Sequence, residues 1–119
     1  MLDLFSGSGV VGLESASRGA GHVVFVDASP VCAKTIRANC EALGLRGASV
    51  ACTRAEQFLA KPEKYGEEQP FHLVTATPPY DEVSGPRASK YGWFWETFVH
   101  GSALVHSCWH LSPLPYHFF

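Results

Sequence analysis

The stretch MLDLFSGSGVVG, residues 1–12, decides the fold of this chain. Apolar residues run directly into a glycine-rich turn, and the turn runs into a segment that suits a helix. In such a strand–loop–helix unit, glycines let the backbone approach a ligand and the helix N-terminus presents N–H groups to it. We therefore expect the other elements of the chain to pack around this loop.

The composition is that of one folded domain. The chain has 119 residues, 46% of them hydrophobic and 17% charged, with a formal net charge of −2. Nucleic-acid-binding domains usually show a basic excess, so any RNA contact must be local or made by parts outside this sequence. No apolar run approaches the roughly 20 residues of a membrane helix, and no basic segment precedes Met1 as in a signal peptide. We expect a soluble protein.

Cysteine and histidine usage indicates neither disulfides nor a metal. The four cysteines form no CxxC pair, and three of them lie in segments predicted to be buried helix or strand. We expect reduced core thiols in a reducing compartment. The histidines near the end of the chain lack an acidic ligand or a second cysteine close by, so we expect no metal site. These residues are Cys32, Cys40, Cys52 and Cys108, and His100, His106 and His110.

Strands and helices alternate along the first part of the chain. Apolar runs predict strands at residues 2–5, 23–27, 48–52 and 71–76, and helical spacing predicts helices that begin at Val10, Pro30 and about Thr53. The run Val23-Val24-Phe25-Val26 is continuous, as is typical of a strand covered on both faces of a parallel sheet. The alternation therefore predicts an α/β fold with a parallel sheet and right-handed crossovers.

Several boundaries follow known patterns. Ser29 is predicted to cap the second helix, and the Thr53–Glu56 spacing predicts a capping box for the third. Residues 61–70 are predicted to form a surface loop. After residue 80 the pattern fades: residues 91–105 suit one amphipathic helix, and residues 109–119 suit no element. We expect a core over residues 1–80 and an atypical tail over residues 81–119.

A glycine pattern and an acidic residue together suggest a nucleoside site. Gly7, Gly9 and Gly12 match GxGxxG between a predicted strand and a predicted helix, and Asp27 ends the next strand. A carboxylate at that strand end is the expected partner of ribose hydroxyls, because it accepts both of their protons. The alternative for Asp27 is a role at the entry to the second helix. We favour ribose binding, since the loop and Asp27 would lie at neighbouring strand ends.

Asp3 lies inside the first predicted strand, where a carboxylate is costly unless it is hydrogen-bonded. It either ties down the glycine loop or reaches the amino group of a ligand. No Gly-Lys-Ser/Thr follows the loop, which excludes a P-loop, and Ser8 lacks the GxSxG frame of a hydrolase nucleophile. Two nucleoside cofactors remain, a dinucleotide and S-adenosylmethionine.

The sequence Thr77-Pro78-Pro79-Tyr80 favours S-adenosylmethionine. In a doubly wound sheet the fourth strand lies beside the first, so its end faces the glycine loop. The Tyr80 ring can stack on a base turned out of its helix, and the Thr77 side chain and a carbonyl can accept hydrogen bonds from an exocyclic NH2. Those bonds aim the nitrogen lone pair at a methyl group and stabilise the developing positive charge. The alternative is an ordinary proline turn with a packed tyrosine.

Five segments together resemble the RsmD family of S-adenosylmethionine-dependent methyltransferases, which modify guanine N2 in small-subunit ribosomal RNA. The segments are Leu2–Gly9, Gly12–Glu14, Arg18–Ala20, Val23–Asp27 and Pro78–Tyr80. The resemblance implies a Rossmann-like class I methyltransferase fold with a parallel sheet, about four of whose usual seven strands are recognisable here. It also implies ribosomal RNA or the small ribosomal subunit as partner, and we expect a monomer that binds no metal or membrane.

The resemblance also assigns roles to single residues. The implied contacts to S-adenosylmethionine are Asp3, Phe5, Gly7, Ser8, Gly9 and Asp27, and the implied catalytic residues at the target amino group are Thr77, Pro78, Pro79 and Tyr80. Three features depart from the family. Thr77 stands where Asp or Asn is usual, and Glu56 substitutes for the acidic residue that reads adenine after the third strand. Family members also extend further at both ends.

Two other functions remain open. One is a truncated, catalytically inactive fragment that at most binds the cofactor, and the other is a nucleotide-dependent oxidoreductase. Asp3 and the Pro-Pro-Tyr sequence argue against the oxidoreductase. The expected compartment is the cytoplasm, or the chloroplast for a plant-type member of the family.

Overall fold

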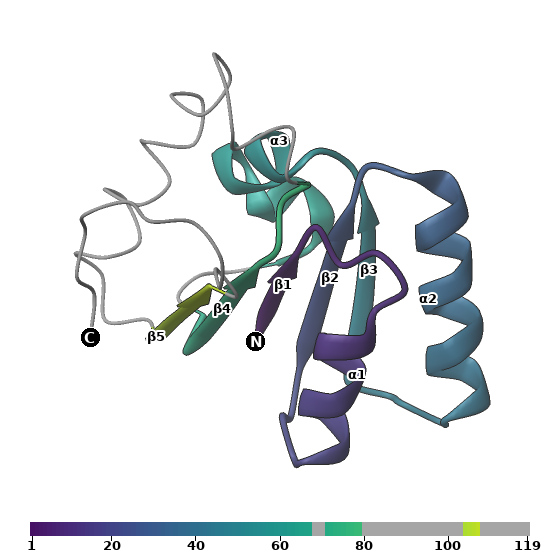
Figure 1. The fold of residues 1–119 in the computed structure, drawn as a ribbon. Helices are drawn as coiled ribbons and strands as arrows, with labels where there is room; N and C mark the ends of the chain where they lie inside the picture. Colours follow the sequence, from purple (N-terminus) through teal and green to yellow (C-terminus); the bar gives the residue numbers. More distant parts are fainter. Residues whose placement is uncertain (68–70, 80–103, 108–119) are drawn as a thin grey trace.

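The computed structural model describes residues 1–67, 71–79 and 104–107. Its elements follow in chain order: β1 (Leu2–Leu4), α1 (Val10–Ser17), β2 (Val23–Asp27), α2 (Pro30–Ala42), β3 (Ala48–Cys52), α3 (Ala55–Ala60), the 3-10 helix η1 (Pro62–Tyr65), β4 (Leu73–Ala76) and β5 (Leu104–Ser107). Figure 1 shows a twisted sheet with helices packed against it. The predicted α/β class and all four predicted strands are confirmed.

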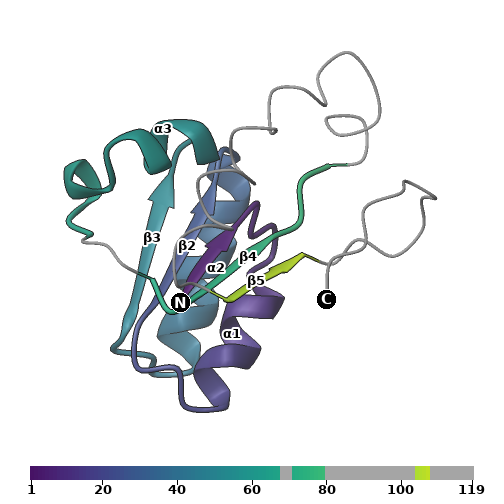
Figure 2. The ribbon, with the colours of Figure 1, turned by 90° about the vertical axis from the view of Figure 1, so that its left-hand side faces the viewer.

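The strands pair in the order β3-β2-β1-β4-β5, and every pairing is parallel. The chain runs from β1 outward to β2 and β3, and then returns to the other side of β1 with β4. This reversal is the switch point of a doubly wound sheet, where ligands bind beyond the carboxyl ends of the strands. Figure 2 shows β1 between β2 and β4, as the sequence predicts.

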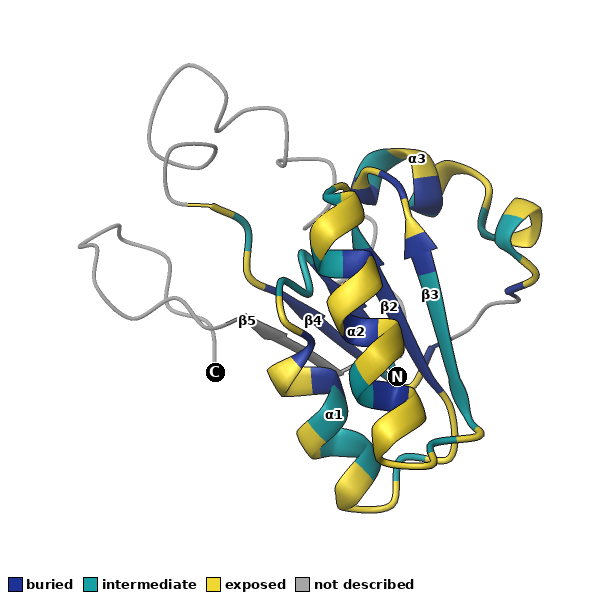
Figure 3. Cartoon of the chain, turned by 90° about the vertical axis from the view of Figure 1, so that its right-hand side faces the viewer, coloured by how far each residue is buried: buried dark blue, intermediate teal, exposed yellow. Residues whose placement is uncertain are grey.

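Two helical layers cover the sheet. Val23 and Phe25 of β2 join a buried cluster with Ile36 and Cys40 of α2, against which α1 also packs. The alternate residues of β2, Val24 and Val26, lie in a second cluster with Phe58 of α3 on the opposite face. The four apolar side chains of β2 are fully buried, and most of the strand is coloured as buried in Figure 3, so the continuous apolar run correctly predicted a strand covered on both faces.

Two helix starts test the predicted caps. Ser29 caps α2 as predicted, because its side chain accepts a hydrogen bond from the Cys32 amide with Pro30 in the first turn. The capping box at Thr53 is wrong, since the N-cap of α3 is Arg54 and no side-chain cap is formed. The Thr53 hydroxyl instead donates to Gln57 Oε1 at 3.0 Å and accepts from Tyr65 Oη at 3.0 Å. Tertiary contact with η1 therefore replaces the local cap.

The predicted helix over residues 91–105 is wrong at its end. Leu104 and Val105 belong to β5, which pairs with β4 and adds a strand that the sequence did not predict. Residues 91–103 lie outside the described part of the chain, as do Cys108, His100 and His110. β5 begins within the predicted tail, and the division into a core and a tail stays a prediction.

The charged segment after α3 is less loop-like than predicted. Residues 62–65 form η1, and Glu67 is buried beside His22 of the β2 entry and Ser49 of β3. Cys32, Cys40 and Cys52 are free thiols, but Cys52 is exposed rather than part of the core, because it ends the edge strand β3. Within the described ranges, no helix has the length and apolarity needed to cross a membrane.

Candidate functional site

The loop between β1 and α1, residues 5–9 and here called the glycine loop, is fastened to both neighbouring strands by Ser6. The Ser6 hydroxyl donates to the Asp3 carbonyl at 2.7 Å and accepts from the Val26 amide at 3.0 Å. The Ser6 amide donates to the Val26 carbonyl at 3.1 Å. Sequence reasoning missed this role, although a hydroxyl directly before the first glycine was its visible signal.

The glycine loop begins with a strained residue. Phe5 has a φ of 59°, in the left-handed region that non-glycine residues seldom occupy. Such a conformation costs on the order of 1–3 kcal/mol and is found most often at ligand sites. Gly7 follows with a φ of 57°, and a Cβ built on Gly7 meets nothing within 4 Å. A side chain at position 7 would therefore point into space that none of the described residues fills.

Asp27 touches the glycine loop directly. Its Oδ2 accepts from the Gly7 amide at 2.8 Å, and its Oδ1 accepts from the Ser29 amide at 2.8 Å. The helix-entry contact that the sequence left open is thus present, and the loop and Asp27 lie together as predicted. Asp27 is half-buried, and each carboxylate oxygen keeps a second lone pair for a further donor. Ribose binding by Asp27 stays a prediction.

Asp3 is enclosed by protein, with 1% of its surface exposed. Its Oδ1 accepts from the Thr75 hydroxyl at 2.8 Å, and its Oδ2 accepts from the Gly12 amide at 3.1 Å. Burial raises the pKa of Asp3, the hydrogen bonds from Thr75 and Gly12 lower it, and the nearby charge of Asp27 raises it. Of the two roles left open by the sequence, the bond from Gly12 in the first turn of α1 fits the first, and contact of Asp3 with a ligand stays a prediction.

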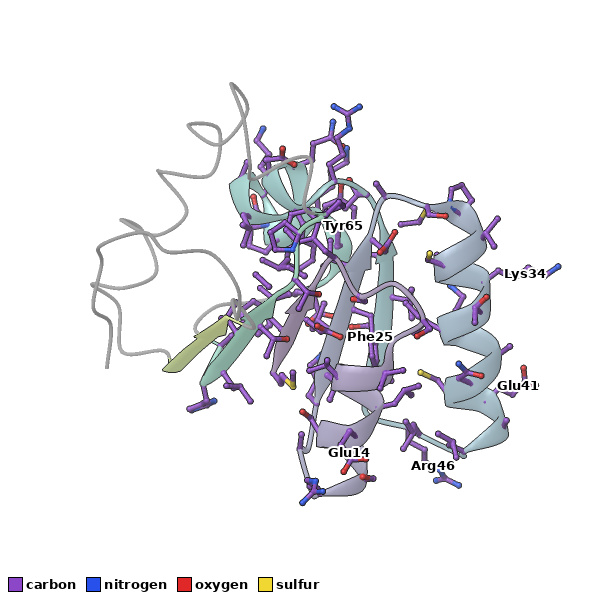
Figure 4. The ribbon with its side chains drawn as sticks, viewed as in Figure 1. Glu14, Phe25, Lys34, Glu41, Arg46 and Tyr65 are labelled. Atoms are coloured by element: carbon purple, nitrogen blue, oxygen red, sulfur yellow. The ribbon has the colours of Figure 1, made fainter. Side chains whose placement is uncertain are left out.

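Gly12 sets how closely α1 approaches the sheet. A Cβ on Gly12 would lie 2.2 Å from Cε1 of Phe25, a ring that is fully buried between β2 and the helices. Figure 4 shows Phe25 next to the start of α1, whereas Lys34 and Glu41 point from α2 away from the sheet. Only glycine at position 12 lets α1 start where its amide meets Asp3.

The Thr77-Pro78-Pro79 corner lies at the same edge of the sheet as the glycine loop. Ala76 of β4 pairs with Leu4 of β1, so the two strands end side by side. The Thr77 hydroxyl donates to the Phe5 carbonyl at 3.3 Å, and the Thr77 amide donates to the Leu4 carbonyl at 3.4 Å. Thr77 and Pro79 are exposed and Pro78 is half-buried. The predicted juxtaposition is confirmed, while Tyr80 lies outside the described residues.

Two further predicted site residues, Ser8 and Glu56, lie on different sides of this edge, and Cys52, which was not predicted as a site residue, lies there too. Ser8 is exposed at the tip of the glycine loop, and its carbonyl accepts from Nδ2 of Asn39 in α2 at 3.4 Å. Glu56 is half-buried in the first turn of α3, which packs on the face opposite α1 and α2. Cys52 ends β3 at the same edge, with its sulfur 4.0 Å from the Ala28 carbonyl oxygen.

The glycine loop keeps donors for an anionic or polar ligand. Among the described residues, no hydrogen bond is made by the amides of Ser8, Val10 and Val11. Two of these amides belong to the first turn of α1, where the helix dipole favours negative charge. Together with the open side of Gly7 and the carboxylate of Asp27, they fit a nucleoside cofactor that carries a carboxylate. In the part of the chain that the structure covers, no cluster of metal-binding side chains is found.

Comparison with known proteins agrees with this geometry. The chain is 39% identical over 82 residues to a Bacillus subtilis (strain 168) protein named "putative rRNA methyltransferase YlbH", a match that covers 68% of this chain and 44% of YlbH. A solved "putative methyltransferase yhhF" from Escherichia coli is 30% identical with a TM-score of 0.60, covering 66% of this chain and 42% of that one.

Two further solved structures are similar. A hypothetical protein from Thermus thermophilus is 34% identical with a TM-score of 0.64, over 88% of this chain and 54% of that one. A "putative methylase" from Haemophilus influenzae is 30% identical with a TM-score of 0.61, over 75% and 55% of the two chains. The chain therefore spans about half the length of the relatives it matches.

The sheet order and the structural similarities define a Rossmann-like fold of the methyltransferase class. The family described as conserved hypothetical protein 95 matches residues 1–90, which is most of the chain. The chain belongs to this family, the RsmD family.

Proposed function

We propose that this chain carries the cofactor-binding part of an S-adenosylmethionine-dependent methyltransferase that acts on the exocyclic amino group of guanine in ribosomal RNA. The observation that carries the proposal is the contact between the two predicted half-sites: the Thr77 hydroxyl lies 3.3 Å from the Phe5 carbonyl that opens the glycine loop. The name of YlbH supports the methyltransferase class and an rRNA substrate.

The cofactor would lie across the carboxyl ends of β1 and β2. Asp27 would accept hydrogen bonds from the ribose hydroxyls with the lone pairs that Gly7 and Ser29 leave unused. The unbonded amides of Ser8, Val10 and Val11 would hold the carboxylate of the amino-acid end. S-adenosylmethionine supplies an electrophilic methyl group on its sulfonium sulfur.

The target amino group would be held at Thr77. Because the Thr77 proton is directed to the Phe5 carbonyl, the hydroxyl oxygen presents lone pairs, as an Asp or Asn side chain would. The Thr77 hydroxyl oxygen and a carbonyl oxygen of the proline corner would each accept a hydrogen bond from one N–H group of the target amino group. These two bonds would aim the nitrogen lone pair at the methyl carbon. The new N–C bond forms as the S–C bond breaks, and the nitrogen then releases a proton to water. Positioning carries most of the catalysis, with Tyr80 proposed to stack on the base.

The test uses the whole chain, labelled S-adenosylmethionine and small ribosomal subunits that lack the modification. We expect label in guanine N2, a loss of at least about tenfold in Thr77→Val, and near wild-type transfer in Thr77→Ser, since serine keeps the acceptor. Thr35→Val is the matched control, because Thr35 is an exposed threonine whose hydroxyl donates only to Val31 of its own helix. Equal transfer by Thr77→Val and Thr35→Val would remove Thr77 from the reaction.

Two other outcomes would redirect the proposal. Binding of S-adenosylhomocysteine without any label transfer would leave this chain as a cofactor-binding unit that needs further sequence to act. Binding of NAD instead of S-adenosylhomocysteine would favour the oxidoreductase.

The proposed partner is ribosomal RNA in the small subunit, and the proposed oligomeric state is a monomer. The free thiols Cys32, Cys40 and Cys52 support a reducing compartment.

A further inference from the structure

Thr75 of β4 has a contact that neither half of the proposed site requires. Its hydroxyl donates to Oδ1 of Asp3 at 2.8 Å, in a position where Thr75 and Asp3 are direct partners in the β1–β4 pairing. Thr75 is buried, with 8% of its surface exposed, so water does not offer Asp3 an equal donor. A buried carboxylate needs such donors to offset its lost hydration.

The second oxygen of Asp3 acts on α1. The N-cap of α1 is Gly9, which has no side chain with which to cap the helix. Asp3 Oδ2 accepts from the amide of Gly12, the third residue of α1, at 3.1 Å. This is the contact that an Asp or Ser at the N-cap would normally make, and it is supplied here from the neighbouring strand. The negative charge also complements the positive end of the helix dipole.

We infer that Thr75 is a positioning residue: by orienting the Asp3 carboxylate onto the Gly12 amide, it fixes the first turn of α1 and with it the glycine loop. A chain of two buried hydrogen bonds then joins β4, which carries the proposed target corner, to the proposed cofactor loop. Thr77 makes a parallel connection two residues later through Phe5. The consequence for cofactor binding rests on the proposed function, whereas the consequence for Gly12 does not.

The inference predicts an effect at a distance. Removing the Thr75 hydroxyl leaves Asp3 with a single donor among the residues that the structure describes, so its carboxylate is no longer held in one orientation toward Gly12. The Gly12 amide should then exchange with solvent faster, and the affinity for S-adenosylhomocysteine should fall, although Thr75 is not proposed to touch the cofactor. We expect both changes to be about tenfold, the usual effect of losing one hydrogen bond to a charged group.

The experiment compares Thr75→Val, Thr75→Ser and the wild-type chain. Amide exchange is followed by NMR, which resolves Gly12 from the β2 amides that report on the whole fold. Thr75→Val is expected to speed exchange at Gly12 while leaving β2 protected, and Thr75→Ser to restore it, since serine keeps the hydroxyl. Thr53→Val is the matched control, a buried threonine with two side-chain hydrogen bonds near α3 that lie away from Asp3.

Unchanged exchange at Gly12 in Thr75→Val overturns the inference, and so does a Thr75→Ser protein that behaves like Thr75→Val. If Thr75→Val loses protection throughout β2, the comparison of Thr75→Ser with Thr53→Val decides. Wild-type protection of Gly12 in Thr75→Ser, with β2 protected as in Thr53→Val, supports positioning by the hydroxyl, and loss of Gly12 protection in Thr75→Ser refutes it. Calorimetry with S-adenosylhomocysteine is the separate readout. No binding by wild-type protein would count against the proposed function and leave the Gly12 result standing.

Discussion

Substitution of Gly12 by alanine tests the packing that holds the glycine loop in place. In an exposed helix this change stabilises a protein by about 1 kcal/mol, because glycine loses more backbone entropy on folding. At Gly12 the new Cβ would lie 2.2, 2.8 and 2.9 Å from Cε1, Cζ and Cδ1 of Phe25. Ordinary carbon–carbon contacts are about 3.5–4.0 Å, so the ring or the helix must move by about 1 Å or more.

The Phe25 ring has little room to yield. It is fully buried, and it shares its cluster with Val23, Ile36 and Cys40. Overpacking of this kind costs about 1–3 kcal/mol, and a contact this short belongs in the upper part of that range. After subtracting the helix gain, we expect Gly12→Ala to lower the free energy of unfolding by about 2 kcal/mol. A shift of α1 would also lengthen the 3.1 Å bond from Gly12 to Asp3.

Urea unfolding followed by circular dichroism measures this free energy. Adding Phe25→Leu removes the ring edge, so alanine at position 12 should then be neutral or stabilising, with a coupling of about 2–3 kcal/mol in the double-mutant cycle. Gly21→Ala is the control: its added Cβ meets nothing within 4 Å, and we expect a change within about 0.5 kcal/mol. A Gly12→Ala protein more stable than wild type, or additive effects with Phe25→Leu, would refute the packing argument.

Three further predictions concern the polar side chains of the site. Asp27→Ala should weaken S-adenosylhomocysteine binding by about 1–3 kcal/mol in calorimetry. Glu41→Ala is the control and should leave the affinity unchanged, because Glu41 lies on the outer side of α2. Equal affinities of the two variants would remove Asp27 from the site. Bound S-adenosylhomocysteine should slow alkylation of the exposed Cys52 but not of buried Cys40, as peptide mapping would show; an unchanged Cys52 rate places the adenosine elsewhere. Burial raises the pKa of Asp3 above its ordinary 3.8, so the folded chain holds this proton to higher pH than the unfolded chain does. The wild type should therefore lose stability relative to Asp3→Asn as the pH rises through the raised pKa. A difference in the free energy of urea unfolding that does not change with pH would contradict this.

The parts of the fold that were predictable follow from local patterns. The run Val23–Val26 has no polar side chain on either face, which only a doubly covered strand accommodates, and Ser29 with Pro30 carries its cap information within three residues. The neighbourhood of the glycine loop and Asp27 also followed, because consecutive parallel strands end at one edge. The predicted cap at Thr53 was wrong, because the Thr53 hydroxyl instead accepts a hydrogen bond from Tyr65, twelve residues further along the chain.

The contacts that sequence reasoning missed depend on strand register. Ser6 reaches Val26 across β1 and β2, and Thr75 reaches Asp3 over a separation of 72 residues. Neither contact can be predicted from a short stretch of sequence. Until the strand register is known, nothing distinguishes Thr75 from any other small polar residue on β4. The positive φ of Phe5 was not predicted either, because apolar residues 2–5 have the same sequence pattern whether or not the last of them leaves the strand conformation.

The strand register in turn depends on one of these contacts, because the buried Asp3 favours the observed register. A shift of β4 by one residue would place Val74 or Ala76 opposite Asp3 and turn Thr75 toward the opposite face of the sheet. Both replacements are apolar, so the carboxylate would keep only the Gly12 donor, and a buried charged group left with a missing partner costs about 1–3 kcal/mol or more. Register and site geometry are therefore one choice: the pairing that satisfies Asp3 is the pairing that brings Thr77 to the Phe5 carbonyl.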